Sequence, residues 1–186
     1  MTDGFPVTAA VNAVTPADQG AQAWTTDPGT FTGTPTLALT SGLPVLTMFR
    51  YAGGTMNTIW INITVAGATL TAGQNFAAIV NSAGVVVAST ADQSATWVST
   101  GQKQMALTTP VVLPSGIYFV WIVANGTTPP TLRACNAATN LGNLQQVVNP
   151  STFRFSTNGT GVIAVPANVT LANNAAIAVG VLAVMT

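Results

Sequence analysis

The sequence is nearly devoid of charged residues. Of its 186 residues, four are Lys or Arg, four are Asp or Glu, and none is His. The four acids are all aspartates, so glutamate is missing as well. General acid–base catalysis uses a titratable group poised near the working pH, most often histidine, and metal sites draw on His, Cys, Asp and Glu. The composition therefore predicts a protein that is not an enzyme and that holds no metal or cofactor.

Cysteine and long apolar runs are also scarce. Cys135 is the single cysteine, so it has no partner for an intrachain disulfide, and we expect it to be a small buried hydrophobe. The longest apolar run, Ile117–Ala124, is far shorter than the ~20 residues that span a bilayer. The first residues, Met1–Pro6, lack the basic and apolar regions of a signal peptide. These features predict synthesis in the cytoplasm and no membrane partner.

The low charge also bears on association. Charged residues make up 4% of the chain and the formal net charge is zero, whereas a typical globular protein carries charge on about a quarter of its residues. A neutral chain has no electrostatic reason to bind nucleic acid. Near-zero net charge favours association, so we expect a homo-oligomer or a component of a larger assembly.

Short β-rich runs between turn signals fill most of the sequence. Asn57–Val65 alternates apolar and polar residues, which predicts a half-buried antiparallel strand. Val45–Tyr51 precedes it, and Ala52–Gly54 between them predicts a hairpin. Ile117–Ala124 is apolar on both faces, which predicts a central strand covered on both sides.

The other predicted elements complete a set of about eight or nine strands, as in a sandwich or jelly roll. These strands are Gln74–Val80 and Val85–Ser89, joined by a tight turn, and Gln104–Thr109, Thr131–Cys135, Thr152–Phe155 and Ala176–Val184. Leu141–Val148 does not fit the strand pattern and predicts a helical turn or two. Residues 1–35 contain few apolar anchors, which predicts an extended arm or a loosely wound first segment, with the arm carried into the predicted fold. The predicted fold is all-β: an antiparallel β-sandwich of jelly-roll type over residues 36–186 with an extended N-terminal arm over residues 1–35.

Aromatic residues in the arm and on strand faces are the candidate interface residues. Trp60 shares its strand face with polar residues, so we expect it to point outward, where packing against a subunit or the arm ranks above stacking on a sugar. Trp97 follows a polar loop and fits either the core or an interface, whereas Trp121 and Tyr118 are expected in the core. The full candidate set is Phe5, Trp24, Phe31, Trp60 and Trp97.

Catalytic interpretations find little support. A Ser–Lys pair would have to use Lys103, for which a solvated position on a strand edge is the favoured interpretation. A glycosidase needs two facing carboxylates, and Asp92 is the one acid outside the arm region. We therefore expect Asp92 to initiate a turn.

A series of blocks resembles a family of small structural proteins of tailed bacteriophages that infect actinobacteria, often described as minor tail or virion proteins. The blocks span roughly residues 45–185 and occur in the same order: Ala68–Phe76, Asn81–Gly84, Ser89–Trp97, Ser99–Lys103, Leu113–Tyr118 and Asn125–Pro130. In that family the strand beginning at Ile117 usually holds more aromatic residues, and an acid often stands where this chain has Asn81. No catalytic residue is carried over.

The resemblance implies a non-enzymatic structural protein on the surface of a virion. Two placements remain open: a capsid decoration protein that cements neighbouring capsomers, which small size and an arm favour, and a minor tail protein involved in attachment to the host surface, which the resemblance favours. The expected partners are other virion proteins and further copies of this chain. A carbohydrate-binding module that acts alone, on a host-surface glycan, is the competing class.

Overall fold

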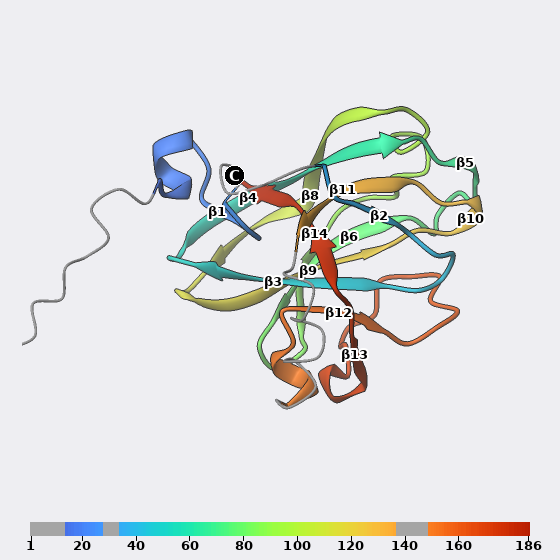
Figure 1. The fold of residues 1–186 in the computed structure, drawn as a ribbon. Coiled ribbons are helices and arrows are strands. Elements are labelled where there is room, and N and C mark those ends of the chain that lie inside the picture. The colour runs from blue at the N-terminus through green and yellow to red at the C-terminus, as the bar shows by residue number, and fades with distance from the viewer. Residues whose placement is uncertain (1–13, 28–33, 137–148) are drawn as a thin grey trace, which may run out of the picture.

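The computed structural model describes residues 14–27, 34–136 and 149–186. Within them the protein is all-β: two antiparallel sheets lie face to face, and a two-stranded ribbon flanks them (Figure 1). No helix among these residues is long and apolar enough to cross a membrane.

One sheet has six strands in the order β13-β12-β3-β9-β6-β7. Its strands are β3 (Val45–Tyr51), β6 (Phe76–Asn81), β7 (Val86–Ser89), β9 (Gly116–Val123), β12 (Phe155–Asn158) and β13 (Asn174–Ala176). The doubly apolar run forms β9, which lies between β3 and β6 and is buried on both faces, as its sequence predicts. The tight turn between β6 and β7 is also confirmed.

The second sheet has seven strands arranged around β4, which pairs with β8, β11 and β15. Its strands are β1 (Ala23–Trp24), β2 (Thr36–Ala38), β4 (Gly54–Val65), β8 (Gly101–Leu113), β11 (Thr131–Asn136), β14 (Val179–Val181) and β15 (Ala183–Met185). The ribbon pairs β5 (Ala68–Leu70) with β10 (Gly126–Thr128). The short 3-10 helices are η1 (Pro16–Gln19), η3 (Pro150–Thr152) and η4 (Leu171–Asn173).

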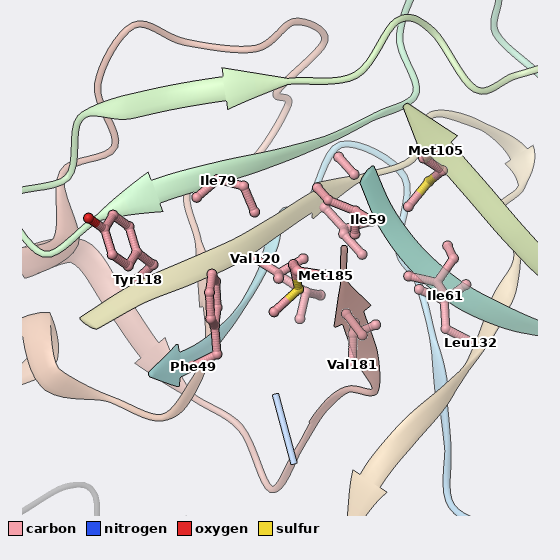
Figure 2. Packing of buried hydrophobic residues seen from close by; sticks show 14 of the residues in the cluster. Phe49, Ile59, Ile61, Ile79, Met105, Tyr118, Val120, Leu132, Val181 and Met185 are labelled. Carbon is pink, nitrogen blue, oxygen red and sulfur yellow. The ribbon is translucent and has the colours of Figure 1, made fainter. Parts of the chain in front are cut away.

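The main core lies between the two sheets. Side chains of β3, β6 and β9 meet side chains of β4, β8, β11, β14 and β15 there, as Figure 2 shows for Phe49, Val120, Ile59 and Met185. A second cluster lies on the outer face of the six-stranded sheet, where Val169 and Leu171 cover Phe119 and Trp121. The six-stranded sheet is thus covered on both faces, which explains the nearly continuous apolar sequence of β9.

The hairpin predicted at Ala52–Gly54 is wrong. β3 and β4 do not pair with each other: β3 pairs with β9 and β12, and β4 belongs to the other sheet. Gly53 and Gly54 have φ values of 102° and 132°, a backbone that glycine adopts readily, and the chain turns there from one sheet to the other. Glycines in a short connection indicate a tight turn whether the chain pairs back in the same sheet or crosses to the other sheet.

Several strand boundaries also differ from those predicted. β8 continues through Pro110, which an edge strand tolerates because the missing N–H need not face a neighbour. Thr152 ends the 3-10 turn η3, and the strand starts only at Phe155. Val65, expected on the buried face, is 56% exposed at the end of β4. The predicted helix over Leu141–Val148 lies outside the described residues.

One segment of the predicted arm region, β1, joins the sheet of its own chain. β1 pairs with β15, placing Ala23 at 0% exposure, and the hydroxyl of Thr25 donates to the carbonyl of Val181 at 2.8 Å. η1 lies beside β1 and away from the sheets (Figure 1). The described part of residues 14–27 is therefore anchored on the seven-stranded sheet.

Candidate functional site

Trp60 lies on the outer face of the seven-stranded sheet. The alternation of β4 turns Ile59 and Ile61 into the core, so Trp60 points away from it and is half-buried. Its register partners are Val184 on β15 and Gln104 on β8. The indole Nε1 donates to the hydroxyl of Thr186 at 3.3 Å, which fixes the ring against the last strand. The outward orientation predicted from the sequence is confirmed.

A hollow of about 530 Å³ opens beside Trp60, and we call it the Trp60 hollow. Its lining joins an apolar group to a polar group. The apolar group includes Trp60, Pro35, Leu182 and Val184, and the polar group includes Gln19, Asn62, Gln102 and Arg133. An aromatic face beside amides and a guanidinium can stack on a sugar ring or receive a segment of another protein.

A second hollow, of about 680 Å³, lies at the edge where β1 meets β3, and we call it the Arg50 hollow. Trp24, Met48 and Arg50 contribute to its lining. Arg50 is exposed, because β3 turns its neighbours Phe49 and Tyr51 into the core. No hydrogen bond or ion pair of the Arg50 side chain falls within the described residues.

Tyr51 and Arg154 also line the Arg50 hollow, and both are held in place. The Tyr51 hydroxyl donates to Gln22 Oε1 at 2.7 Å. Burial and the neighbouring Tyr118 raise the pKa of Tyr51, so the hydroxyl remains a donor. Arg154 donates to the hydroxyl of Thr26 at 3.2 Å, and its guanidinium lies 5.3 Å from the centre of the Phe155 ring. The hollow thus holds two guanidiniums against one carboxylate, that of Asp27, and has aromatic walls.

Trp97 is a correction among the candidate interface residues. It is 0% exposed and belongs to the core cluster between the sheets, so it is not available to a partner. The preceding polar segment turns back through hydrogen bonds from the N–H groups of Thr96 and Trp97 to the carbonyl of Gln93. That turn carries the indole inward, although the flanking sequence is polar. Phe5 and Phe31 lie outside the described residues.

Lys103 and Ser99 are brought together at the surface. Lys103 Nζ donates to Ser99 Oγ at 2.7 Å and to the carbonyl of Thr100 at 3.1 Å. A lysine that serves as a general base must lose its proton, which requires desolvation. Here the amine sits at an exposed turn beside β8, which pairs only with β4 along this stretch. The contact ties down the turn and resembles the edge lysine that deters strand pairing.

Asp92 belongs to a buried polar network. Burial favours the neutral acid, but hydrogen bonds from the Ser94 hydroxyl and from backbone N–H groups, including that of Asn75, outweigh it and lower the pKa of Asp92. Asn75 is 0% exposed; its amide donates to the carbonyl of Thr71 at 2.6 Å and its Oδ1 accepts from the N–H of Asn125 at 2.9 Å. The expected turn role of Asp92 is confirmed, and the turn closes one end of the sandwich.

Within the described ranges, the remaining groups considered for chemistry are the thiol of Cys135 and any cluster of metal-binding side chains. Cys135 is 0% exposed, and burial raises the pKa of its thiol, in agreement with the expected buried hydrophobe. No group of three or more His, Cys, Asp or Glu that could hold a metal ion occurs in residues 14–27, 34–136 and 149–186.

Sequence reasoning missed the Arg50 hollow and the Asn75 network. The alternation of β3 alone places Arg50 outward, so that part could have been found. Arg154 lies beside it only because β12 pairs with β3, and Asn75 meets Asn125 across 50 positions of sequence. No pattern in the sequence near these residues indicates either contact.

No protein-family model matches the chain, and a comparison with curated proteins also finds no match. The case for a function therefore depends on the residues themselves and on the two hollows.

Proposed function

We propose that the protein is a non-enzymatic structural component of a tailed-bacteriophage particle, synthesised in the host cytoplasm and displayed on the virion surface. The favoured placement is a capsid decoration protein that cements its neighbours. The observation that carries the proposal is the Trp60 hollow, an apolar depression with amide groups on the outer face of a sheet. When a partner covers a tryptophan in such a position, the burial of its ring stabilises the complex.

The resemblance in the blocks from Ala68 to Pro130 supports the phage origin. The composition supports a structural role, because a surface covered mainly by Thr, Asn, Ser and Gln has little repulsion to keep copies apart. We also propose the jelly-roll type for the sandwich. Its support is that the chain changes sheet repeatedly, at β2 to β3, β3 to β4, β4 to β6, β7 to β8, β8 to β9, β9 to β11, β11 to β12 and β13 to β14.

The arm remains part of the proposal, in a narrower form. Because Ala23 and Thr25 are buried in the domain, we limit the segment that could reach a neighbour to residues 1–13. Deleting residues 1–13 should leave the melting temperature of the isolated domain unchanged and lower its incorporation into particles. Deleting residues 1–30 should destabilise the domain as well, because it removes β1 from the sheet.

Two alternatives have specific support. A minor tail protein that contacts the host surface is favoured by the resemblance. A carbohydrate-binding module that acts alone is favoured by Trp60 beside Asn62 and Gln102, which could stack on a sugar and bind its hydroxyl groups. The last alternative predicts a monomer that binds a host glycan.

Substitution of Trp60 tests the proposal. Particles grown in cells that supply tagged wild-type, Trp60→Ala or Trp60→Phe protein are purified, and the bound protein is quantified. We expect Trp60→Ala to be incorporated poorly while its melting temperature stays near that of the wild type, and Trp60→Phe to retain part of the incorporation. Normal incorporation of Trp60→Ala would contradict a packing role. A monomer whose glycan affinity depends on Trp60 would favour the lone module.

A further inference from the structure

We propose that the Arg50 hollow is the docking site for residues 1–13 of a second copy of this chain, with the Asp3 carboxylate bound at Arg50. This inference deepens the proposed assembly role and rests on it. The proposed occupant is a segment outside the described residues. The lining of the hollow, the charges of the chain and the point where that segment joins the domain support it.

The hollow offers a cationic site without a matching acid on Arg50. Arg50 and Arg154 are two of the four basic residues of the chain, and both line this hollow. Both residues are exposed, but the Arg154 guanidinium contacts the Thr26 hydroxyl and the ring of Phe155, whereas the Arg50 guanidinium has no hydrogen-bond or ion-pair partner within the described ranges. A guanidinium binds a carboxylate through two parallel hydrogen bonds, so an acidic group is the matching ligand.

The hydrogen bonds of the other aspartates narrow the choice of the carboxylate that could bind Arg50. Asp18 accepts hydrogen bonds from the N–H and hydroxyl of Thr15, and Asp92 accepts them from Asn75 and Ser94. Asp27 already lines the hollow and has an interaction of its own. The remaining aspartate of the chain is Asp3. Asp3 is therefore the one aspartate left to complement Arg50, the guanidinium of this hollow that has no hydrogen bond within the described residues.

The position of the segment allows exchange between copies. Thr15, Pro16 and Ala17 line the Arg50 hollow, so residues 1–13 join the domain at its rim. When two copies face each other through this hollow about a two-fold axis, each segment starts beside the hollow of its partner, as in a reciprocal swap. A stretch of 13 residues spans at most about 45 Å, about the diameter of a compact domain of this size. Phe5 lies two residues beyond Asp3, within reach of the apolar walls formed by Trp24 and Met48.

Disulfide trapping tests the docking directly. The full-length variants Asp3→Cys and Arg50→Cys are mixed under mild oxidation, and non-reducing electrophoresis separates chains of 18.8 kDa from dimers. The native Cys135 is 0% exposed and stays out of the reaction. The matched control pairs Asp3→Cys with Val112→Cys, because Val112 is 76% exposed and lies on β8, outside the hollow. We expect a heterodimer in the first mixture and its loss in the control.

The charge pair supplies a second readout. Asp3→Arg and Arg50→Asp should each shift the mass measured by light scattering from the dimer to the single chain, whereas their mixture should regain dimer. Melting temperatures should stay near that of the wild type, because Arg50 is exposed. A disulfide formed within one chain carrying both cysteines, with none in the mixture, would overturn docking between copies. Equal trapping at Val112 would overturn the site, as would dimers that ignore both charge reversals.

The result can be separated from the proposed function. If the protein is incorporated into particles but Asp3 and Arg50 are not trapped, the docking fails and the virion role stands. If trapping succeeds and the protein is missing from particles, the docking stands and the virion role fails.

Discussion

Replacement of Asn75 by alanine should destabilise the protein strongly, although Asn75 lies in no strand. Its side chain makes two hydrogen bonds in a position with 0% exposure: the amide donates to the carbonyl of Thr71 and Oδ1 accepts from the N–H of Asn125. Alanine removes both partners: the buried N–H of Asn125 is left without a hydrogen bond, whereas the carbonyl belongs to Thr71, an exposed residue, and can bind water. The unsatisfied N–H costs about 1–3 kcal/mol and the lost bond to Thr71 about 0.5–1.5 kcal/mol, so we expect a loss of about 1.5–4.5 kcal/mol.

That loss is a large part of the ~5–15 kcal/mol by which domains are stable. With a urea dependence of about 1–3 kcal/mol per molar, the unfolding midpoint should fall by at least about 0.5 M. Urea titration followed by tryptophan fluorescence measures it, since Trp97 and Trp121 are buried.

Asn81→Ala is the matched control. Asn81 Oδ1 also accepts two hydrogen bonds, from the N–H groups of Ala83 and Val85, but these lie in an exposed turn where water can replace it. We expect a loss below about 1 kcal/mol, in the lower part of the range for a hydrogen bond. Equal losses for Asn75→Ala and Asn81→Ala would refute the view that a buried polar network closes this end of the sandwich.

Further predictions concern Asp92 and Gly180. The lowered pKa of Asp92 contributes stability above its unfolded value near 3.8 and loses it as the pH falls through the lower folded value. Wild type should therefore lose more stability than Asp92→Asn between pH 5 and pH 2, as acid titration by circular dichroism would show; parallel curves would argue against it. An added Cβ at Gly180 would lie 2.2 Å from Phe155 Cδ1, so Gly180→Ala should cost about 1–3 kcal/mol in thermal unfolding. Gly116→Ala, whose Cβ would find ordinary contact at 3.5 Å, should cost clearly less, and an equal cost would contradict the close approach.

Part of the fold could be predicted from local patterns. Alternation in β4 placed Ile59, Ile61 and Trp60 on their correct faces, and the doubly apolar run identified β9 as a central strand. These patterns succeed because burial of a strand face acts on each residue directly.

Other features depend on contacts between distant segments. Ala52–Gly54 has the composition of a hairpin, and only the pairing of β3 with β9 shows that the chain changes sheet there. Trp97 follows polar residues, yet a turn that begins at Gln93 directs it into the core. The same holds for the candidate site. The outward position of Trp60 could be predicted from the alternation of β4, whereas Arg50 and Arg154 line one hollow only because β12 pairs with β3.

The central claim is that this protein is a structural component of a phage particle. Quantitative mass spectrometry of purified particles, with antibody labelling of intact ones, tests it most directly. The account predicts many copies per particle that are accessible to antibody at the surface. Particles that lack the protein, together with a monomer free in the lysate, would contradict it.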